Sequence, residues 1–131
     1  MEKIINSTEE MIDLAWKLTK EGYNKFLLNG DLGAGKTHFC KWVATQLWID
    51  KNKVKSPTYT YLNIYDEKFL HIDMYRLEMA EDIIEKGIIE EIENYNYICI
   101  EWPQFTEYYV DNKWLEIKIE KINENTRKIS W

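Results

Sequence analysis

Arginine is scarce in this sequence of 131 residues, and basic side chains as a whole are outnumbered. The chain has only two arginines, Arg76 and Arg127, and its 23 acidic residues exceed its 17 basic ones, which gives a net charge of −6. Proteins that grip nucleic acids usually show the opposite balance, because they neutralise phosphates with basic side chains. We therefore expect no direct tight binding to RNA or DNA.

Long apolar runs and spaced cysteines are also lacking. No uncharged apolar run approaches the roughly 20 residues that cross a bilayer, so we expect no membrane segment. The first ten residues, MEKIINSTEE, lack the basic-then-apolar pattern of a signal peptide. Cys40 and Cys99 are spaced neither as metal ligands nor as a secreted disulfide framework, and we expect both to be small buried hydrophobic residues. These absences predict a cytoplasmic protein, and the length predicts a single domain over residues 1–131.

The spacing of the apolar residues predicts alternating helices and strands. A capping box at Ser7 and Glu10 opens a helix that ends near Gly22. A short buried strand at residues 25–29 precedes a glycine-rich turn and a second amphipathic helix. The remaining predicted elements are a hairpin of strands within 56–65 and 69–75, two short helices that meet at Gly87, a strand at 97–100, a helical turn at 104–109, and strands at 114–122 and 127–131.

Glycine is rare too, but three of the five glycines lie between residues 30 and 35. The segment satisfies the phosphate-loop pattern Gly-x-x-x-x-Gly-Lys-[Ser/Thr], which here ends at Gly35, Lys36 and Thr37. Glycines let backbone N–H groups curve around anionic oxygens, and the following helix directs its positive end to the same place. Because a strand precedes and a helix follows, we expect a nucleoside triphosphate site. Lys36 would reach the β- and γ-phosphates, and the Thr37 hydroxyl would coordinate Mg²⁺.

Elimination favours ATP as the nucleotide. GTPases read guanine with an Asn-Lys-x-Asp element, and no Asn-Lys pair in this chain has the required aspartate. Small-molecule kinases with this loop commonly enclose the transferred phosphoryl group with several arginines. A chain with only two arginines fits that pattern poorly. The favoured interpretation is an ATPase. A small-molecule kinase and a binding module that does not hydrolyse its nucleotide stay open as alternatives.

Acidic residues at strand ends are the candidates for a second metal ligand and for activating water. Glu101 follows the predicted strand at 97–100 and is placed like the metal-binding acid of such ATPases. Asp73 lies in an otherwise apolar strand, where an unpartnered carboxylate would be costly, so we expect it to face a metal-bound water, Arg76 or a backbone group. For His71 on the same strand face we expect a structural hydrogen bond.

Four motifs in this order and at these separations resemble the TsaE family, the bacterial ATPases of tRNA threonylcarbamoyladenosine biosynthesis. They are residues 30–37 (GDLGAGKT), 56–60 (SPTYT), 71–77 (HIDMYRL) and 101–103 (EWP). The resemblance covers nearly the whole chain. It implies an α/β, P-loop NTPase-like three-layer fold in which helices flank a central mixed β-sheet. It also implies a Mg²⁺-dependent ATP hydrolase that is slow alone and is stimulated by partners.

The resemblance further implies roles for individual residues. ATP would be held by Asp31, Gly33, Ala34, Gly35, Lys36, Thr37, His38 and Arg127. Thr37 and Glu101 would bind Mg²⁺. Asp73, Glu101 and Thr58 would be catalytic, with Thr58 in a switch-like segment near the γ-phosphate. The side chain of Trp102 would form one wall of the site. His38 stands where the family has a second hydroxyl residue, and Thr126-Arg127 stands where it has Gly-Arg.

Partners are implied by the resemblance as well. Two related proteins of the sugar kinase-like superfamily form the bacterial threonylcarbamoyl transferase complex and install the group on adenosine 37 of tRNAs that read codons beginning with A. A member of this family does not itself make the modification. Its ATP hydrolysis is expected to reset the partner complex between rounds.

Overall fold

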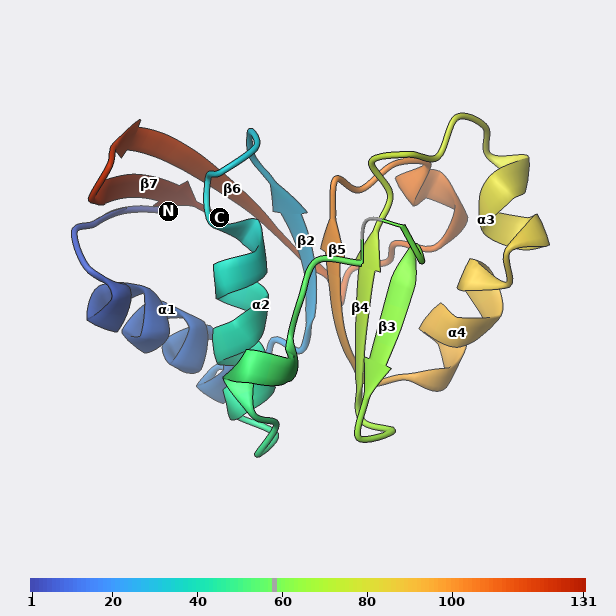
Figure 1. Cartoon of the computed structure of the whole chain (residues 1–131), viewed down its shortest axis with the longest axis horizontal. Coiled ribbons are helices and arrows are strands. Elements are labelled where there is room, and N and C mark those ends of the chain that lie inside the picture. Colours follow the sequence, from blue (N-terminus) through green and yellow to red (C-terminus); the bar gives the residue numbers. More distant parts are fainter. Residues whose placement is uncertain (58) are drawn as a thin grey trace.

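The computed structural model describes residues 1–57 and 59–131 (Figure 1). The described residues form seven strands in one mixed sheet, in the spatial order β1-β7-β6-β2-β5-β4-β3. Their bounds are β1 Glu2–Ile5, β2 Lys25–Asn29, β3 Leu62–Tyr65, β4 Phe69–Asp73, β5 Tyr97–Glu101, β6 Leu115–Asn123 and β7 Thr126–Ser130. The neighbours β6, β2, β5 and β4 are parallel, whereas the β1–β7, β7–β6 and β4–β3 pairs are antiparallel.

Helices cover both faces of this sheet. They are α1 Thr8–Lys20, α2 Lys36–Thr45, α3 Glu81–Glu85 and α4 Ile88–Asn94, with single 3-10 turns at Lys51–Lys53 and Thr106–Tyr108. The helices α1 and α2 lie on one side, and α3 and α4 lie on the other (Figure 1). The predicted α/β architecture, a mixed central sheet between helical layers, is confirmed.

The central strand β2 contributes to two separate cores. Phe26 and Leu28 pack with the apolar residues of α1 and α2, whereas Leu27 belongs to the cluster around α3 and α4. Successive side chains of a strand point to opposite faces, so a strand covered on both sides needs an unbroken apolar run. The sequence KFLLN of β2 supplies that run.

The local helix signals have the expected form. Ser7 is the N-cap of α1, and its hydroxyl accepts a hydrogen bond of 3.2 Å from the Glu10 backbone N–H. Gly87 takes a left-handed conformation with φ of 70° between α3 and α4, as the break at that glycine predicted. None of the described helices combines the length and apolar character needed to span a bilayer.

Two strand predictions differ from the structure. Strand β1 was not predicted, because its residues Glu2–Ile5 bury only Ile5 and lack clear alternation; pairing with β7 forms the strand. The strand expected within residues 56–65 begins only at Leu62. Tyr61 has a φ of 68°, and its N–H donates to the Pro57 carbonyl, so the chain turns before it enters the sheet.

Candidate functional site

The candidate site lies at the carboxyl edge of the parallel strands. Strand β2 leads into the glycine loop, β5 ends at Glu101, and β4 ends at Asp73. Asp73 is directly opposite Glu101 in the β4–β5 register, and Leu28 is opposite Glu101 in the β2–β5 register. Parallel strands end on the same side of a sheet, so three segments that are distant in sequence meet there.

The glycine loop passes close to a neighbouring strand and then enters α2. A Cβ added at Gly30 would lie 2.5 Å from the backbone oxygen of Ile119 in β6, so a larger residue does not fit without movement. Gly35 is the N-cap of α2, with a φ of 114° that favours glycine. The loop backbone thereby curls at the positive end of a helix, where anions are stabilised.

Lys36 is buried below this loop, with an exposed fraction of 5%. Its ammonium donates to the carbonyl of Gly30 at 2.5 Å and to that of Asp31 at 2.9 Å, and lies 4.2 Å from the centre of the Trp102 ring. Burial lowers the pKa of Lys36 from its usual value, although Glu101 and other nearby carboxylates oppose this shift. The lysine is thus positioned beside the loop rather than extended into solvent.

Thr37 and Glu101 form an oxygen pair at the start of α2. The Thr37 hydroxyl oxygen lies 3.0 and 2.9 Å from the two carboxylate oxygens of Glu101. These are the two residues that the resemblance assigns to Mg²⁺, and hydroxyl and carboxylate oxygens are the ligands that Mg²⁺ prefers.

Asp73 ends β4 beside this oxygen pair. One of its carboxylate oxygens accepts from the Tyr75 backbone N–H at 2.9 Å and the other accepts from the Ser56 hydroxyl at 3.2 Å. Burial raises the pKa of Asp73 above its usual value. A backbone group, rather than Arg76, is therefore one of its partners, and the motif at residues 56–60 contributes the other.

Buried polar side chains are concentrated at this edge of the sheet. In the part of the chain that the structure describes, four polar or charged residues are buried, and they are Lys36, His71, Asp73 and Glu101. Buried ionisable groups are costly, and they gather where a protein uses them. Their proximity marks this edge as the functional site.

A cleft of about 410 Å³ opens above these groups. Nine of the residues predicted for the site line it, and they are Gly33, Gly35, Lys36, Thr37, His38, Asp73, Glu101, Trp102 and Arg127. Asp31 and Ala34 take part in the same loop through their backbone, which joins them by a hydrogen bond of 3.1 Å. Thr58, the third residue predicted to be catalytic, lies outside the described residues.

Arg127 reaches the glycine loop from β7. Its Nε donates to the Ala34 carbonyl at 2.7 Å, and its terminal nitrogens donate to Gly33 at 3.4 Å and to Asn123 at 2.7 Å. The guanidinium therefore ties the loop to the β6–β7 turn. Replacement of the family's Gly-Arg by Thr126-Arg127 leaves this arginine at the loop.

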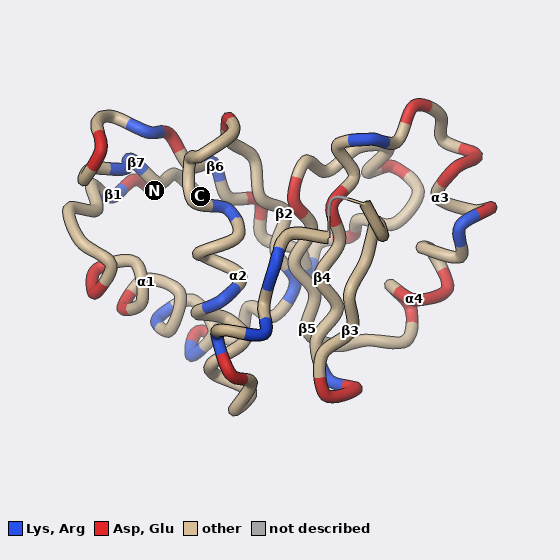
Figure 2. The backbone as a smooth tube through the Cα atoms, in the orientation of Figure 1, with Lys and Arg blue, Asp and Glu red and all other residues tan. Residues whose placement is uncertain are grey.

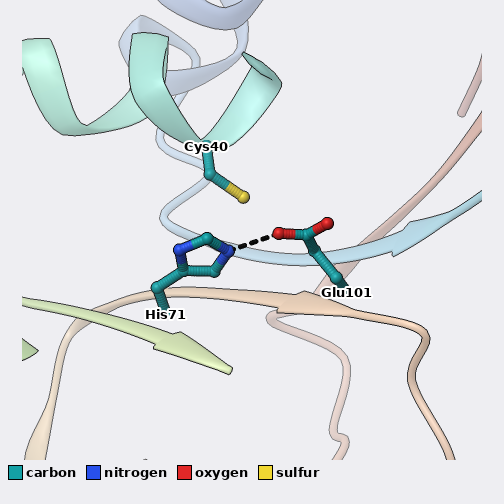
Figure 3. Close-up of side chains that lie close together, drawn as sticks. All are labelled: Cys40, His71 and Glu101. Atoms are coloured by element: carbon teal, nitrogen blue, oxygen red, sulfur yellow. Dashed lines mark hydrogen bonds and ion pairs between the residues drawn. The ribbon is translucent and has the colours of Figure 1, made fainter. Parts of the chain in front are cut away.

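Three features of the site were not predicted from the sequence. His71 lies 2.5 Å from Glu101, and the side chains of Cys40, His71 and Glu101 converge below α2 (Figure 3). Trp102 adopts a left-handed φ of 53°, which for a bulky residue is strained and often marks a functional position. The Tyr75 ring packs 4.9 Å from the Trp102 ring at the mouth of the cleft. A hydrogen bond at His71 and a place for Trp102 beside the site were expected from the sequence, but no local pattern shows the Glu101 partner, the ring contact or the strained backbone.

Comparison with known proteins assigns the chain to a family. The family described as "Threonylcarbamoyl adenosine biosynthesis protein TsaE" matches residues 5–129. The chain belongs to the TsaE family. Members of this family take part in the biosynthesis of threonylcarbamoyladenosine in tRNA, and the resemblance read from the four motifs is confirmed.

Relatives from distant bacteria support this membership of the TsaE family. The tRNA threonylcarbamoyladenosine biosynthesis protein TsaE of Rickettsia felis is 36% identical over 132 residues, which cover 97% of this chain and 77% of that protein. The protein of the same name from Aquifex aeolicus is 32% identical over 136 residues, covering 98% and 92% of the two chains. The crystal structure of Bacillus subtilis YdiB is 26% identical with a TM-score of 0.61, and the match covers 98% of this chain and 82% of that one.

Proposed function

We propose that this TsaE-family chain is a Mg²⁺-dependent ATPase that acts with partner proteins in threonylcarbamoylation of tRNA. The observation that carries the proposal is the Thr37–Glu101 oxygen pair, 2.9 to 3.0 Å apart, at the mouth of a glycine loop with a buried lysine. Each part has a role in nucleoside triphosphate hydrolysis, and the three parts meet in one cleft.

The loop has the properties of a phosphate site. The close approach of Gly30 to Ile119 leaves no room for a Cβ, so glycine at this position lets the loop pack directly against β6. The N-terminus of α2 and the Lys36 ammonium supply positive charge beside it. A triphosphate would lie along this loop with its terminal phosphate towards Glu101 and Asp73.

A second cavity suits the base of the nucleotide. Its volume is about 210 Å³, and it shares Gly35, His38 and Arg127 with the main cleft. Met11 and Trp42 line it, so it offers an apolar surface next to polar groups of the β6–β7 turn. Adenine is flat and largely apolar with polar edges, and it would enter this cavity from the end of the loop that is remote from Glu101.

His38 lies between the two cavities as a neutral side chain. Burial lowers its pKa, and the positive charges of Lys41 and Arg127 add to that shift. A neutral imidazole at this point contacts the nucleotide without adding charge to the α-phosphate. The His38 backbone N–H, in the first turn of α2, remains the donor for that phosphate.

The residues around the oxygen pair suit a divalent cation. Mg²⁺ bound with the nucleotide would neutralise charge that develops on the phosphates during hydrolysis. Thr37 and Glu101 would hold it, because both present oxygens at the same point beside the loop. The Tyr75 N–H and the Ser56 hydroxyl orient the carboxylate of Asp73, which would position the attacking water.

The proposed partners are the two sugar kinase-like proteins of the bacterial threonylcarbamoyl transferase complex, and the proposed location is the cytoplasm. The segment that carries Ser56 lies next to Asp73, so the presence of a terminal phosphate would change contacts at the surface of the protein. A partner that reads this surface would distinguish the ATP-bound state. Hydrolysis would then release or reset the partner complex.

Phosphate release tests the proposal. The chain would be incubated with ATP and Mg²⁺, first alone and then with the partner pair, and inorganic phosphate would be followed over time. We expect slow release alone and faster release with the partners. Binding of ATP without release under either condition would instead indicate a non-hydrolysing module, and labelled phosphate on a metabolite would indicate a kinase.

A further inference from the structure

His71 is a buried polar side chain that contacts Glu101. It lies on β4, is fully buried, and packs its ring 6.3 Å from that of Phe69. Its Nε2 lies 2.5 Å from a carboxylate oxygen of Glu101, while its Nδ1 has no hydrogen-bond partner among the described residues. A carboxylate oxygen can only accept a hydrogen bond, so Nε2 carries a proton and donates it to Glu101.

The carboxylate of Glu101 is consequently held from two sides. Thr37 lies against both of its oxygens, and the Nε2 proton of His71 is directed at one of them. A carboxylate on a free side chain would rotate and lose entropy on binding a cation. One fixed by hydrogen bonds already has its orientation, and such partners of metal ligands typically change metal affinity by about 10- to 100-fold.

We propose that His71 is a positioning residue that sets the divalent-cation affinity of the site by fixing the Glu101 carboxylate. The inference rests on the proposed function, because Glu101 is the proposed cation ligand. His71 itself lies below Glu101 and does not line the cleft. It therefore acts on the cation only through that carboxylate.

Cys40 covers this hydrogen bond from α2 (Figure 3). The ligand atoms of Cys40, His71 and Glu101 lie within 4.8 Å of one another, and all three side chains are buried. Burial raises the pKa of the Cys40 thiol well above its usual value, so the thiol is neutral. It borders the histidine–carboxylate pair from the α2 side.

The choice of variants separates a donor effect from a packing effect. His71→Gln keeps an N–H donor at a reach similar to that of Nε2, whereas His71→Leu keeps bulk and removes the donor. Cys40→Ala is the matched control, because it changes the same buried cluster without removing a hydrogen bond to Glu101. Thermal unfolding of each variant would establish that it is folded.

The measurement is the binding of Mn²⁺ in the presence of a non-hydrolysable ATP analogue, followed by the electron paramagnetic resonance signal of the free ion. We expect His71→Leu to weaken Mn²⁺ binding by about 10- to 100-fold. His71→Gln should recover most of the affinity, and Cys40→Ala should remain close to the wild type. Affinity for the analogue without a divalent cation should be the same in all four proteins.

Several outcomes would overturn the inference. The first is an unchanged Mn²⁺ affinity in His71→Leu. The second is a loss of Mn²⁺ affinity in His71→Gln as large as that in His71→Leu. The third is a loss of the same size in Cys40→Ala, which would indicate that the three side chains bind the ion together. A wild-type protein that binds Mn²⁺ and the analogue but does not hydrolyse ATP would contradict the proposed ATPase activity. The comparison of Mn²⁺ affinities among the His71 and Cys40 variants would still test the role of His71. A wild type that binds no Mn²⁺ would overturn both the proposed ATPase activity and the role of His71.

Discussion

At the scale of single residues, the site is a set of buried charges that compensate one another. Lys36, Asp73 and Glu101 each have exposed fractions of 5% or less. Burial lowers the pKa of Lys36, and the negative charges of Glu101 and Asp73 oppose that shift. Removing one of these groups leaves the others buried with an altered charge balance. Substitutions here should therefore change function more sharply than substitutions on the surface.

The first residue-scale prediction concerns Lys36. We expect Lys36→Ala to remove most ATP binding or turnover while the protein stays folded, because the ammonium is a counter-charge for phosphate. Loss of one charge-assisted contact should cost about 2 kcal/mol or more of binding free energy. Titration calorimetry with ATP and Mg²⁺, with circular dichroism for folding, would measure this. Near wild-type turnover in folded Lys36→Ala would contradict the phosphate site.

The second residue-scale prediction separates binding from hydrolysis. Glu101→Gln and Asp73→Asn keep the shape of each side chain and remove a negative charge at the oxygen pair or beside it. We expect turnover to fall by about 100-fold or more with little change in ATP affinity, because the cation or the attacking water loses its orientation. Single-turnover phosphate release and calorimetry would be compared. Normal hydrolysis by either variant would make that residue structural.

At the scale of elements, the phosphate loop is supported by a strand that lies far away in the sequence. Arg127 of β7 donates to the carbonyls of Ala34 and Gly33, and the same guanidinium also donates to the carbonyl of Asn123 at the end of β6. Loops between elements are usually more mobile than the elements that they join. The glycine loop is held by Arg127 to the antiparallel part of the sheet, which limits the conformations that the loop can adopt.

The element-scale prediction tests that support. We expect Arg127→Ala to lower ATP affinity by about tenfold. Loss of hydrogen bonds from a charged donor costs about 1.5–3 kcal/mol, and part of that free energy stabilises the loop conformation that binds ATP. Lys128→Ala on the same strand is the control, because Lys128 pairs with Glu2 and not with the loop. Calorimetry with ATP would measure both. Equal affinities in the two variants would show that the loop holds its shape without Arg127.

At the scale of the whole molecule, charge is distributed unevenly. Acidic residues are frequent along α3 and α4, away from the glycine loop (Figure 2). They are Glu81, Asp82 and Glu85 in α3 and Glu90, Glu91 and Glu93 in α4. Together with the net charge of −6, this distribution opposes a broad contact with the phosphates of an RNA.

The molecule-scale prediction is that any action on tRNA depends on partners. We expect the isolated chain to bind tRNA more weakly than micromolar at near-physiological salt, because it offers no dense basic surface to release counterions. The partner pair should bind the chain more tightly with an ATP analogue than with ADP, since the Ser56 segment lies beside the proposed terminal phosphate. A tRNA titration and a pull-down would measure these. Micromolar tRNA binding, or partner binding that ignores the nucleotide, would contradict the prediction.

Features that depend on local chemistry could be predicted from the sequence alone. The glycine loop, the capping box at Ser7 and the break at Gly87 are set by backbone conformation within a few residues, so their patterns are readable without a structure. The spacing of apolar residues likewise predicted most helices and strands, and the family resemblance implied a central sheet between helices. Four spaced motifs were specific enough to indicate the TsaE family.

The meeting of residues that are distant in sequence depends on the packing of the whole chain. Strand β1 forms because β7 offers it a partner, and Arg127 supports a loop that lies 93 residues earlier in the chain. His71 contacts Glu101 because β4 and β5 are adjacent and in a particular register, which no local pattern encodes. Pairing across a sheet is set by the packing of the whole chain, and that is why the sequence showed the parts of the site while the fold determined their geometry.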